Sequence, residues 1–514
     1  MVELKEQAGG STMMRVTNNI IANNSKYNVN TNKVSVDKLN SQMSDQKRIH
    51  TPSEDPVIAI RSLRLRGALS QIDQYYTKNI PDAQAWLDIT ETALINMEGI
   101  IASVAKQCDY GATDTLEKSD RQVILDELKE CQKQIYAEGN ADYAGRSIFT
   151  GWKTGEFLTF QNDDLKSSYE ITEHLSSIDV EDLTYINKAP AVQYGQVGEI
   201  MEADMPSVTQ TARLSLGYYN IDMPAAADPI RIYYKDDAGT DRVIECDVKT
   251  LGTDPDDAYN VDEAGNTPKA HFIPETGEII LNNAAKIELR KAQDITFTYT
   301  KTGFQKGELR PEHYYDCTRF KDEAGDDVMV EYKKEDNPID YTVSFNQTIR
   351  INTEASEVFD SRMARYIDDM ISNLQKLDAS DAKIANIEKM MKEARYSDEA
   401  NQADLETMLN AAKKERDLLD DKTQKLFERN IGIWQGYLDK VDLAITDCGS
   451  RASRVELTES RMASQQATFK KLKSTNEDRE LSEIIIDFTS AQTAYQSSLK
   501  ATSKALQQTL LDFI

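Results

Sequence analysis

Five cysteines are the first residues of this chain whose type could support chemistry: Cys108, Cys131, Cys246, Cys317 and Cys448. Thiolates bind zinc or exchange disulfides, and both functions need at least two thiols close together, usually as a CxxC pair. These cysteines are odd in number, widely spaced and without a CxxC pair. We therefore predict small, buried or half-buried thiols that stay free.

The four histidines are isolated in the sequence and stand at His50, His174, His271 and His313. Zinc hydrolases, nucleotide-binding loops, serine hydrolases and EF-hands each need a short motif of fixed spacing. The sequence contains no HExxH, Walker, GxSxG or EF-hand motif. We predict no catalytic residues, no cofactor and no metal site, so the chain is not expected to be an enzyme.

Two acidic stretches, Asp236–Gly239 and Asp326–Asp327, carry carboxylates that could hold a calcium ion. Their spacing fits exposed hairpin turns better, because Asp and Gly favour the backbone conformations of tight turns. Paired carboxylates are common in a chain with 87 acidic residues and do not by themselves indicate catalysis.

The charge of the chain limits its partners. The 514 residues carry a formal net charge of −27, with a pI of about 4.7. Such a surface repels phosphate backbones and anionic lipids, so we expect neither nucleic acid nor membrane as a partner. No apolar run reaches the roughly 18 residues of a membrane-spanning helix. Residues 1–13 lack the apolar core of a cleaved signal peptide, and we expect this extension to be disordered.

Long helices with a heptad pattern are predicted at both ends of the chain. The first helix places Ile20, Tyr27 and Val34 seven residues apart, and Leu39 and Met43 continue an apolar face. It is also rich in Asn, which is a poor helix former. We expect this helix to be marginal alone and to need a partner.

A break follows at residues 51–56, which contain Pro52. Ser53 is predicted to cap the next helix, with Glu54 and Asp55 in its first turn. Pro56 is tolerated there because the first N–H groups of a helix have no internal acceptor.

The second helix is predicted to run to about Tyr110, with heptad rows that indicate coiled-coil packing. One row is Ile80, Leu87, Leu94, Ile101 and Cys108. Pro81 should kink this helix, because proline removes one backbone hydrogen bond. A third helix is predicted at about 119–139, with Gly139-Asn140 as its C-terminal stop.

The middle of the chain alternates in the manner of β-strands. Residues 230–234 and 243–246 flank an Asp-Ala-Gly turn, and residues 272–273 and 279–281 flank a Glu-Thr-Gly turn, so both pairs are predicted hairpins. Residues 295–299 and 341–345 also alternate. The Asp-, Gly- and Pro-rich segment 252–268 is predicted to be a loop.

The C-terminal third returns to a helical pattern. One apolar stripe is formed by Phe359, Met363, Tyr366, Met370, Leu374 and Leu377. The charged segment 378–422 is predicted to be an exposed hairpin or the flank of a coil. The last helix starts at about Leu481. Its apolar surface, which we predict to pack against other helices or subunits, comprises Leu481, Ile484, Phe488, Tyr495, Leu499, Leu506, Leu510 and Phe513.

These patterns predict a mainly α fold with a β insert. Long N- and C-terminal helices should pack as an antiparallel or coiled-coil bundle, with one or more β-rich domains between them. The predicted regions are a disordered extension (1–13), an N-terminal helical region (14–159), a β-rich region (160–345) and a C-terminal helical region (346–514). Apolar helices at both termini favour assembly over catalysis.

Several segments resemble the bacterial flagellin superfamily, and within it the hook–filament junction branch. They are MRVTNNIIANNSKYNVNTNKVSVDKLNSQMSDQKRI (14–49), TPSEDPVIAIRSL (51–63), YAGRSIFTGWKT (143–154) and the helical stretch 454–514. Glu54-Asp55-Pro56-Val57 and the ending Leu510–Phe513 favour the junction branch over true flagellins. The chain departs from the family in its five cysteines, in the charged segment 378–422, and in Gln46, which replaces a turn glycine and leaves the sharpness of that turn open.

The resemblance implies a non-catalytic structural subunit that joins hook to filament and forms a junction ring through its terminal helices. The implied partners are other copies of the chain, a hook-side hook-associated protein, flagellin, and an export chaperone on residues 455–514. The implied location is the extracellular flagellum, reached by type III export without a cleaved signal peptide. Residues 14–50 and 481–514 would pair as an inner layer around a channel.

Three alternatives remain open. The chain could be a divergent flagellin that forms the filament itself, a secreted surface adhesin whose β-rich middle binds a host ligand, or a carrier of an enzyme within that middle. No nucleophile–base pair and no metal-ligand spacing supports the enzyme.

Overall fold

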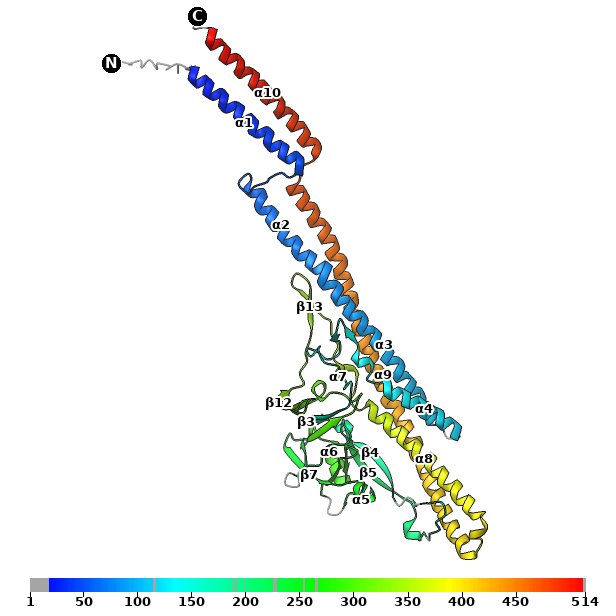
Figure 1. Cartoon of the computed structure of the whole chain (residues 1–514). Coiled ribbons are helices and arrows are strands. Elements are labelled where there is room, and N and C mark those ends of the chain that lie inside the picture. Colours follow the sequence, from blue (N-terminus) through cyan, green and yellow to red (C-terminus); the bar gives the residue numbers. More distant parts are fainter. Residues whose placement is uncertain are drawn as a thin grey trace, which may run out of the picture. The chain divides into compact units, whose positions relative to one another are not determined.

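The computed structural model describes residues 18–113, 117–187, 190, 192–198, 200–224, 229–252, 255–263 and 267–511, except the side chains of residues 18, 203 and 505–511. The chain divides into two compact units, each described by itself. The terminal unit comprises Met1–Pro81, Val343–Asn346 and Leu457–Ile514, and the central unit Asp82–Thr342 and Gln347–Glu456. Long terminal helices and a β-sheet insert confirm the predicted fold class (Figure 1).

The terminal unit is helical. It contains α1 (Asn18–Asp45), α2 (Pro56–Gln74), the last part of α9 (Glu399–Glu477) and α10 (Leu481–Leu511). The helices α1 and α10, from opposite ends of the chain, lie side by side (Figure 1).

The predicted interruption near Pro81 is a turn of π-helix at Tyr75–Asn79, between α2 and α3 (Ile80–Gly111). Proline has no N–H to donate to the preceding turn, so the regular α-helical ladder cannot continue through it. The wider π turn accommodates the missing hydrogen bond one turn before the proline.

The predicted heptad packing of the second helix is confirmed in the central unit. Leu87, Leu94, Ile101 and Cys108 of α3 are buried. A matching row on α9, which sequence reasoning missed, is also buried and consists of Phe427, Trp434, Val441, Cys448 and Val455. The Cys448 thiol lies 3.5 Å from the Leu87 carbonyl, so the two rows meet.

The remaining helices of the central unit are α4 (Lys118–Gln134), α5 (Pro255–Tyr259), α6 (Asn283–Leu289), α7 (Ala355–Val358) and α8 (Met363–Met391). Single 3₁₀ turns occur at Glu138–Asn140, Ser177–Asp179, Glu202–Asp204, Pro311–His313 and Ala394–Tyr396.

Two sequence-based boundaries were wrong. The third helix ends at Gln134, before Gly139, because Tyr136 turns inward and donates a hydrogen bond to the Asp360 carbonyl at 2.9 Å. The segment 252–268 is not only loop, since its described part includes α5, which has Pro255 at its start and acidic residues in its first turn.

The charged segment 378–422 is a helical hairpin, as predicted. It runs from α8 into α9 and closes around a small core of its own, formed by Ile387, Met390, Tyr396, Leu405, Met408 and Ala412. The predicted stripe before it is also confirmed, because Phe359, Met363, Met370, Leu374 and Leu377 are buried.

The β insert is a ten-stranded sheet with the order β12-β11-β3-β10-β6-β7-β8-β9-β5-β4. Its strands are β3 (Asp164–Leu175), β4 (Glu181–Asn187), β5 (Ser207–Ser215), β6 (Arg231–Lys235), β7 (Asp241–Val248), β8 (Ala270–Ile273), β9 (Glu278–Leu281), β10 (Ile295–Phe304), β11 (Asp316–Lys321) and β12 (Asp327–Tyr332). Neighbouring strands are antiparallel, except for the parallel pair β7 and β8. Both predicted hairpins, β6–β7 and β8–β9, are present.

Two smaller sheets complete the β structure. One pairs β1 (Asp142–Tyr143) with β2 (Arg146–Ser147), and the other pairs β13 (Asp340–Ser344) with β14 (Gln347–Arg350).

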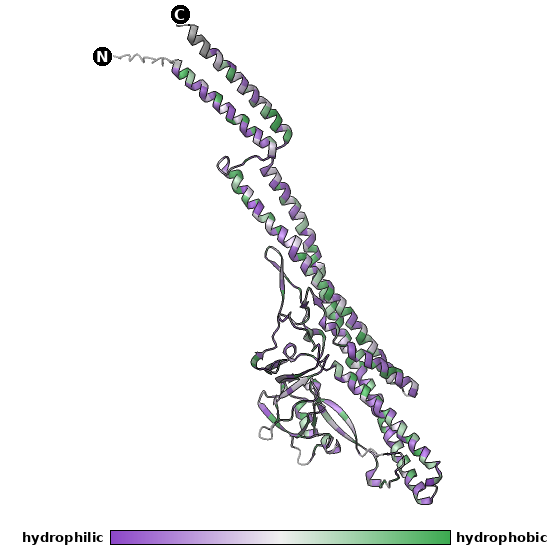
Figure 2. Ribbon diagram, viewed as in Figure 1, coloured by the Kyte–Doolittle hydropathy of each residue, from purple (hydrophilic) through white to green (hydrophobic). Residues whose placement is uncertain are grey.

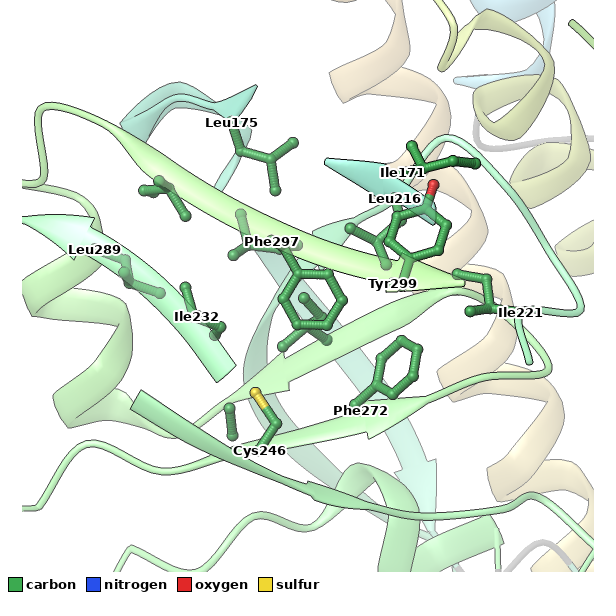
Figure 3. Packing of buried hydrophobic residues seen from close by; sticks show 14 of the residues in the cluster. Ile171, Leu175, Leu216, Ile221, Ile232, Cys246, Phe272, Leu289, Phe297 and Tyr299 are labelled. Carbon is green, nitrogen blue, oxygen red and sulfur yellow. The ribbon is translucent and has the colours of Figure 1, made fainter. Parts of the chain in front are cut away.

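The core of the large sheet is apolar and aromatic. Phe272 and Phe297 lie with ring centroids 5.4 Å apart, and Ile232, Tyr299 and Cys246 pack around them (Figure 3). The acidic stretches form turns, as predicted. Asp236 and Asp322 each accept backbone N–H groups from the residues that follow them.

Two buried arginines attach the sheet to α8. Arg213 of β5 forms ion pairs with Glu181 at 3.0 Å, with Glu278 at 2.7 Å and with Asp369 of α8. Arg365 of α8 donates hydrogen bonds to backbone carbonyls in the loops that connect the strands. Its Nη1 lies 2.6 Å from the Leu216 carbonyl oxygen.

We predict that all five thiols stay reduced and unreactive in the folded protein, because all five are free and buried. Burial raises the pKa of Cys108, Cys246, Cys317 and Cys448 to about 12 and that of Cys131 to about 11, so little thiolate forms near neutral pH. A thiol reagent should label five groups only after denaturation without reductant. Fewer than five, or an intact mass with an internal disulfide, would contradict this.

Candidate functional site

The terminal unit contains the chain segments in which the residues predicted to act in assembly lie. Its two chain segments break at the same point, because α1 ends at Asp45 and α9 ends at Glu477. A β-bridge joins Lys47 to Asp478. The Arg48 N–H donates to the Glu477 carbonyl at 2.7 Å, and the Arg479 N–H donates to the Gln46 carbonyl at 2.9 Å. We call residues 46–48 and 477–479 the junction.

Glu477 is the central side chain of the junction and only 4% exposed. Its carboxylate accepts from Arg66 Nε at 2.7 Å and Nη2 at 2.8 Å, and also from the Ser62 hydroxyl. The Arg66 hydrogen bonds lower the pKa of Glu477 to about 2. A bidentate Arg–carboxylate pair of this kind fixes direction as well as charge, so α2 is held firmly against the end of α9.

Gln46 makes the turn after α1 with a φ of 58°. Its N–H donates to the Gln42 carbonyl at 2.8 Å, which closes the turn. The turn is therefore sharp even though Gln46 stands in place of the turn glycine. Gln46 adopts the left-handed backbone conformation, which is strained for a residue with a Cβ. Gln42 is buried beside it and accepts a hydrogen bond from Arg479 at 3.1 Å.

The cap of α2 is Asp55, which corrects the prediction of Ser53. The Asp55 carboxylate accepts from the N–H groups of Val57 at 3.0 Å and Ile58 at 3.1 Å. Pro56 occupies the first helical position, so the capping residue has to be the one before it, and Ser53 lies two residues too early. Ser53 is exposed and bonds to the Thr51 hydroxyl at 3.0 Å, while Pro52 is exposed in the linker.

The α1–α10 seam uses residues at alternating spacings of three and four. On α10, Ile484 is fully buried, and Phe488 and Tyr495 are half-buried. On α1 the half-buried positions are Ala22, Ser25, Val29, Asn32, Val36, Leu39 and Met43, and Gln42 is buried. Several residues in this set are small or polar, so the seam is thin in the sense that it buries little apolar area. Sequence reasoning missed most of these residues because the larger apolar side chains lie elsewhere on the helix.

Ile20, Tyr27 and Val34 of α1 lie outside the seam, and we call them the outer row. Tyr27 is 72% and Val34 59% exposed, and Ile20 is also exposed. Leu481 and Leu499 of α10 are likewise exposed. The predicted side chains of Leu506 and Leu510, and all of Phe513, lie outside the described residues.

Further apolar side chains are exposed on neighbouring helices. Val57, at 73%, Ile60 and Leu63 form an uncovered stripe along α2, and Ile485 and Ile486 are exposed at the start of α10. Figure 2 shows this green stretch where α10 begins. Such exposure over several turns is typical of a surface that another protein covers. None of the described helices combines the length and apolar character needed to cross a membrane.

Comparison with known proteins finds a family match for the N-terminal part of the chain. Residues 16–154 match the bacterial flagellin N-terminal helical region, which confirms the resemblance for that part of the chain. Flagellar hook-associated protein 3 of Salmonella typhimurium is 31% identical over 118 residues, which cover 23% of this chain and 37% of that protein. A flagellin of Clostridium tyrobutyricum is 24% identical over 143 residues, 28% of this chain and 38% of that one.

Among solved structures, the flagellar junction protein FlgL from Legionella pneumophila aligns with 77% of this chain and 99% of its own, at 12% identity and a TM-score of 0.25. Each of the sequence matches covers little more than a third of the length of the curated relative. These relatives are named as flagellar proteins.

We predict that Glu477→Gln loosens the junction by roughly 1–3 kcal/mol, because the buried carboxylate and its bidentate pair with Arg66 are lost. Amide hydrogen exchange of Arg48 and Arg479 should become faster, with exchange in the central sheet unchanged. The pKa of Glu477 is lower when folded than the ordinary 4.5, so its stabilising effect is present above pH 4.5 and is lost as the pH falls towards 2. The exposed Glu483→Gln is the matched control, and equal exchange in both variants would contradict the assignment.

We also predict opposite effects of two substitutions at Gln46. Glycine relieves the left-handed strain and should stabilise the terminal unit by up to about 1 kcal/mol, whereas β-branched valine should destabilise it by at least about 1 kcal/mol. Urea unfolding followed by circular dichroism measures both. A valine variant as stable as the glycine variant would show that the turn is relaxed.

Proposed function

We propose that this chain, whose residues 16–154 belong to the family of the bacterial flagellin N-terminal helical region, is a structural subunit of the flagellum that joins hook to filament. It would carry no catalysis and would lie outside the cell as part of the flagellum. Its match to hook-associated protein 3 supports the junction role over that of the filament subunit.

The observation that carries the proposal is the exposed apolar surface of the terminal helices. The outer row of α1 and the stripe on α2 leave six large apolar side chains facing solvent: Ile20, Tyr27, Val34, Val57, Ile60 and Leu63. Burial of each would contribute about 1.5–3 kcal/mol, enough together to drive association of identical subunits. The thin α1–α10 seam fits helices that become fully ordered only when neighbouring subunits cover them.

In the assembly that we propose, residues 14–50 and 481–514 form an inner layer around a channel. Residues 56–139 and 356–475 form the next layer, and residues 160–345 project outward. Copies of the chain would make a ring between a hook-side hook-associated protein and flagellin. An export chaperone would cover residues 455–514 before secretion through the type III channel.

A second candidate function is that of a divergent flagellin, favoured by the match to the Clostridium flagellin. Deletion of the gene in its motile host distinguishes the two. A junction subunit is supported by hooks without filaments and by flagellin released into the medium. Loss of filaments without released flagellin, or parent-strain filaments built from this chain, would establish the flagellin role. Unchanged filaments in the deletion strain would overturn both.

We predict that Tyr27→Asp blocks incorporation into the flagellum while the α1–α10 pair still forms, because Tyr27 lies outside the seam. The neighbouring exposed Asn28→Asp adds the same charge to a polar position and should assemble. Immunoblots of purified flagella and of medium would separate failed assembly from failed export. Normal incorporation of Tyr27→Asp would exclude the outer row from the subunit interface.

Substitutions within the seam should act differently. Phe488→Asp and Tyr495→Asp place a charge against α1, so we expect both to unpair α10 and to block incorporation. The central sheet should stay folded. The readout is helix loss in circular dichroism with unchanged exchange protection in the sheet. A purified seam variant that supports filament growth would contradict the inner-layer assignment.

A further inference from the structure

Outside the terminal unit, three ionisable side chains of the central unit converge where two chain segments run together. Glu156, Glu312 and His313 each offer one ligand atom, and these atoms lie within 4.8 Å of one another. Glu312 and His313 end the 3₁₀ turn Pro311–His313, and Glu156 comes from the segment that precedes β3.

The backbone holds these two segments in register. The Arg310 N–H donates to the Leu158 carbonyl at 3.0 Å, and the Phe160 N–H donates to the Glu308 carbonyl at 2.9 Å. Thr159 and Leu309 form a β-bridge between them. The three side chains are therefore presented by a rigid frame, as a site with fixed ligand geometry requires.

Two buried atoms in this cluster lack partners. His313 is 6% exposed, and its Nε2 has no hydrogen-bond partner among the described residues. Glu312 is buried as well, and its Oε2 is likewise unpartnered within the described part of the chain. A buried polar atom without a partner costs about 1–3 kcal/mol, so both atoms are poised to bind a further group.

The His313 imidazole has one ring nitrogen, Nε2, without a partner among the described residues. The ring also has a hydrogen bond with the backbone of Phe157. Because Nε2 is unpartnered, that bond belongs to Nδ1. A histidine ligand typically donates one ring nitrogen to a backbone carbonyl and offers the other to the metal.

The carboxylates add charge and an entry path. The Glu156 and Glu312 carboxylates place two like charges within 4.8 Å of each other. The Glu156 side chain is 45% exposed, so an ion can reach the cluster from solvent.

The two nearby cations have partners of their own. Arg310 pairs with Glu323 at 2.8 Å and stacks over Phe160 at 4.6 Å, while it lies 3.5 Å from Glu312 and 3.9 Å from Glu156. Lys153 donates to the Glu312 carbonyl at 2.6 Å and lies over the Tyr332 ring. They reduce the negative potential of the site. Arg310 pairs with Glu312 Oε1, which leaves Glu312 Oε2 for an ion.

From this geometry we propose that Glu156, Glu312 and His313 bind a divalent transition-metal ion, with Zn²⁺ as the preferred ion. One imidazole nitrogen and two carboxylates match zinc, whereas Ca²⁺ and Mg²⁺ prefer oxygen ligands alone. Zinc–ligand bonds are about 2.0–2.2 Å long, so binding would draw the ligand atoms, now within 4.8 Å of one another, closer together. A water molecule would complete the four-coordinate shell. The site does not depend on the assembly role proposed above.

The test is titration of the full chain, stripped of metal by a chelator, with ZnCl₂ in a calorimeter. We expect one equivalent to bind saturably and to raise the melting temperature. Glu156→Gln keeps the exposed side chain's shape and should weaken zinc binding at least about tenfold. His313→Ala should abolish binding, with fold checked by near-ultraviolet circular dichroism.

His174→Ala is the matched control, because His174 also lies near two carboxylates, Asp294 at 3.5 Å and Asp316 at 3.8 Å, but at the surface. It should bind zinc as the unaltered chain does. The proposal is overturned if the chain shows no saturable zinc binding, if Glu156→Gln binds as tightly as the unaltered chain, or if CaCl₂ or MgCl₂ binds as tightly as ZnCl₂.

Discussion

The ion pair between Arg66 and Glu477 joins segments 411 residues apart in sequence, and the arrangement of the terminal helices depends on it. Both chain segments leave regular helix at this point, so four helix ends have backbone groups without helical partners. The junction satisfies several of them through the paired backbone bonds of Gln46, Arg48 and Arg479. A carboxylate buried there without Arg66 would keep as partners only the Ser62 hydroxyl and the Lys47 ammonium, which lies 3.8 Å away.

Beyond the junction, α1 and α10 have little to hold them as a pair. Their seam includes Ala22, Ser25, Asn32, Ala491 and Ser498, which bury little apolar area, while larger side chains face outward. An isolated helix of this composition is marginal in water. This distribution of apolar side chains is unfavourable for a free chain and favourable for a polymer. The apolar area that would stabilise the α1–α10 pair becomes buried only when neighbouring subunits meet.

Much of this architecture could be predicted from sequence, since heptad and alternating patterns specify element type. The row Leu87–Cys108 was predicted and is buried, because a long apolar repeat has few other places to go. The face of α1 that packs against α10 could not be predicted. Ile20, Tyr27 and Val34 repeat as regularly as the seam residues do, and only the partner helix decides which row is covered. The Arg66–Glu477 pair and the cluster of Glu156 with His313 leave no short-range pattern in the sequence, because tertiary folding alone brings these residues together.

The buried arginines of the central unit show how a large β insert can be attached to helices without interrupting them. Arg213 and Arg365 link the sheet and α8 through directional hydrogen bonds, and a shifted register would leave a buried guanidinium unpaired. Arg365 also requires a close approach of the loops that it binds. Gly277 provides it, since a Cβ there would lie 2.0 Å from the Tyr218 carbonyl oxygen, and its φ is 61°. These few contacts hold β5 and the sheet's connecting loops in a fixed orientation against α8.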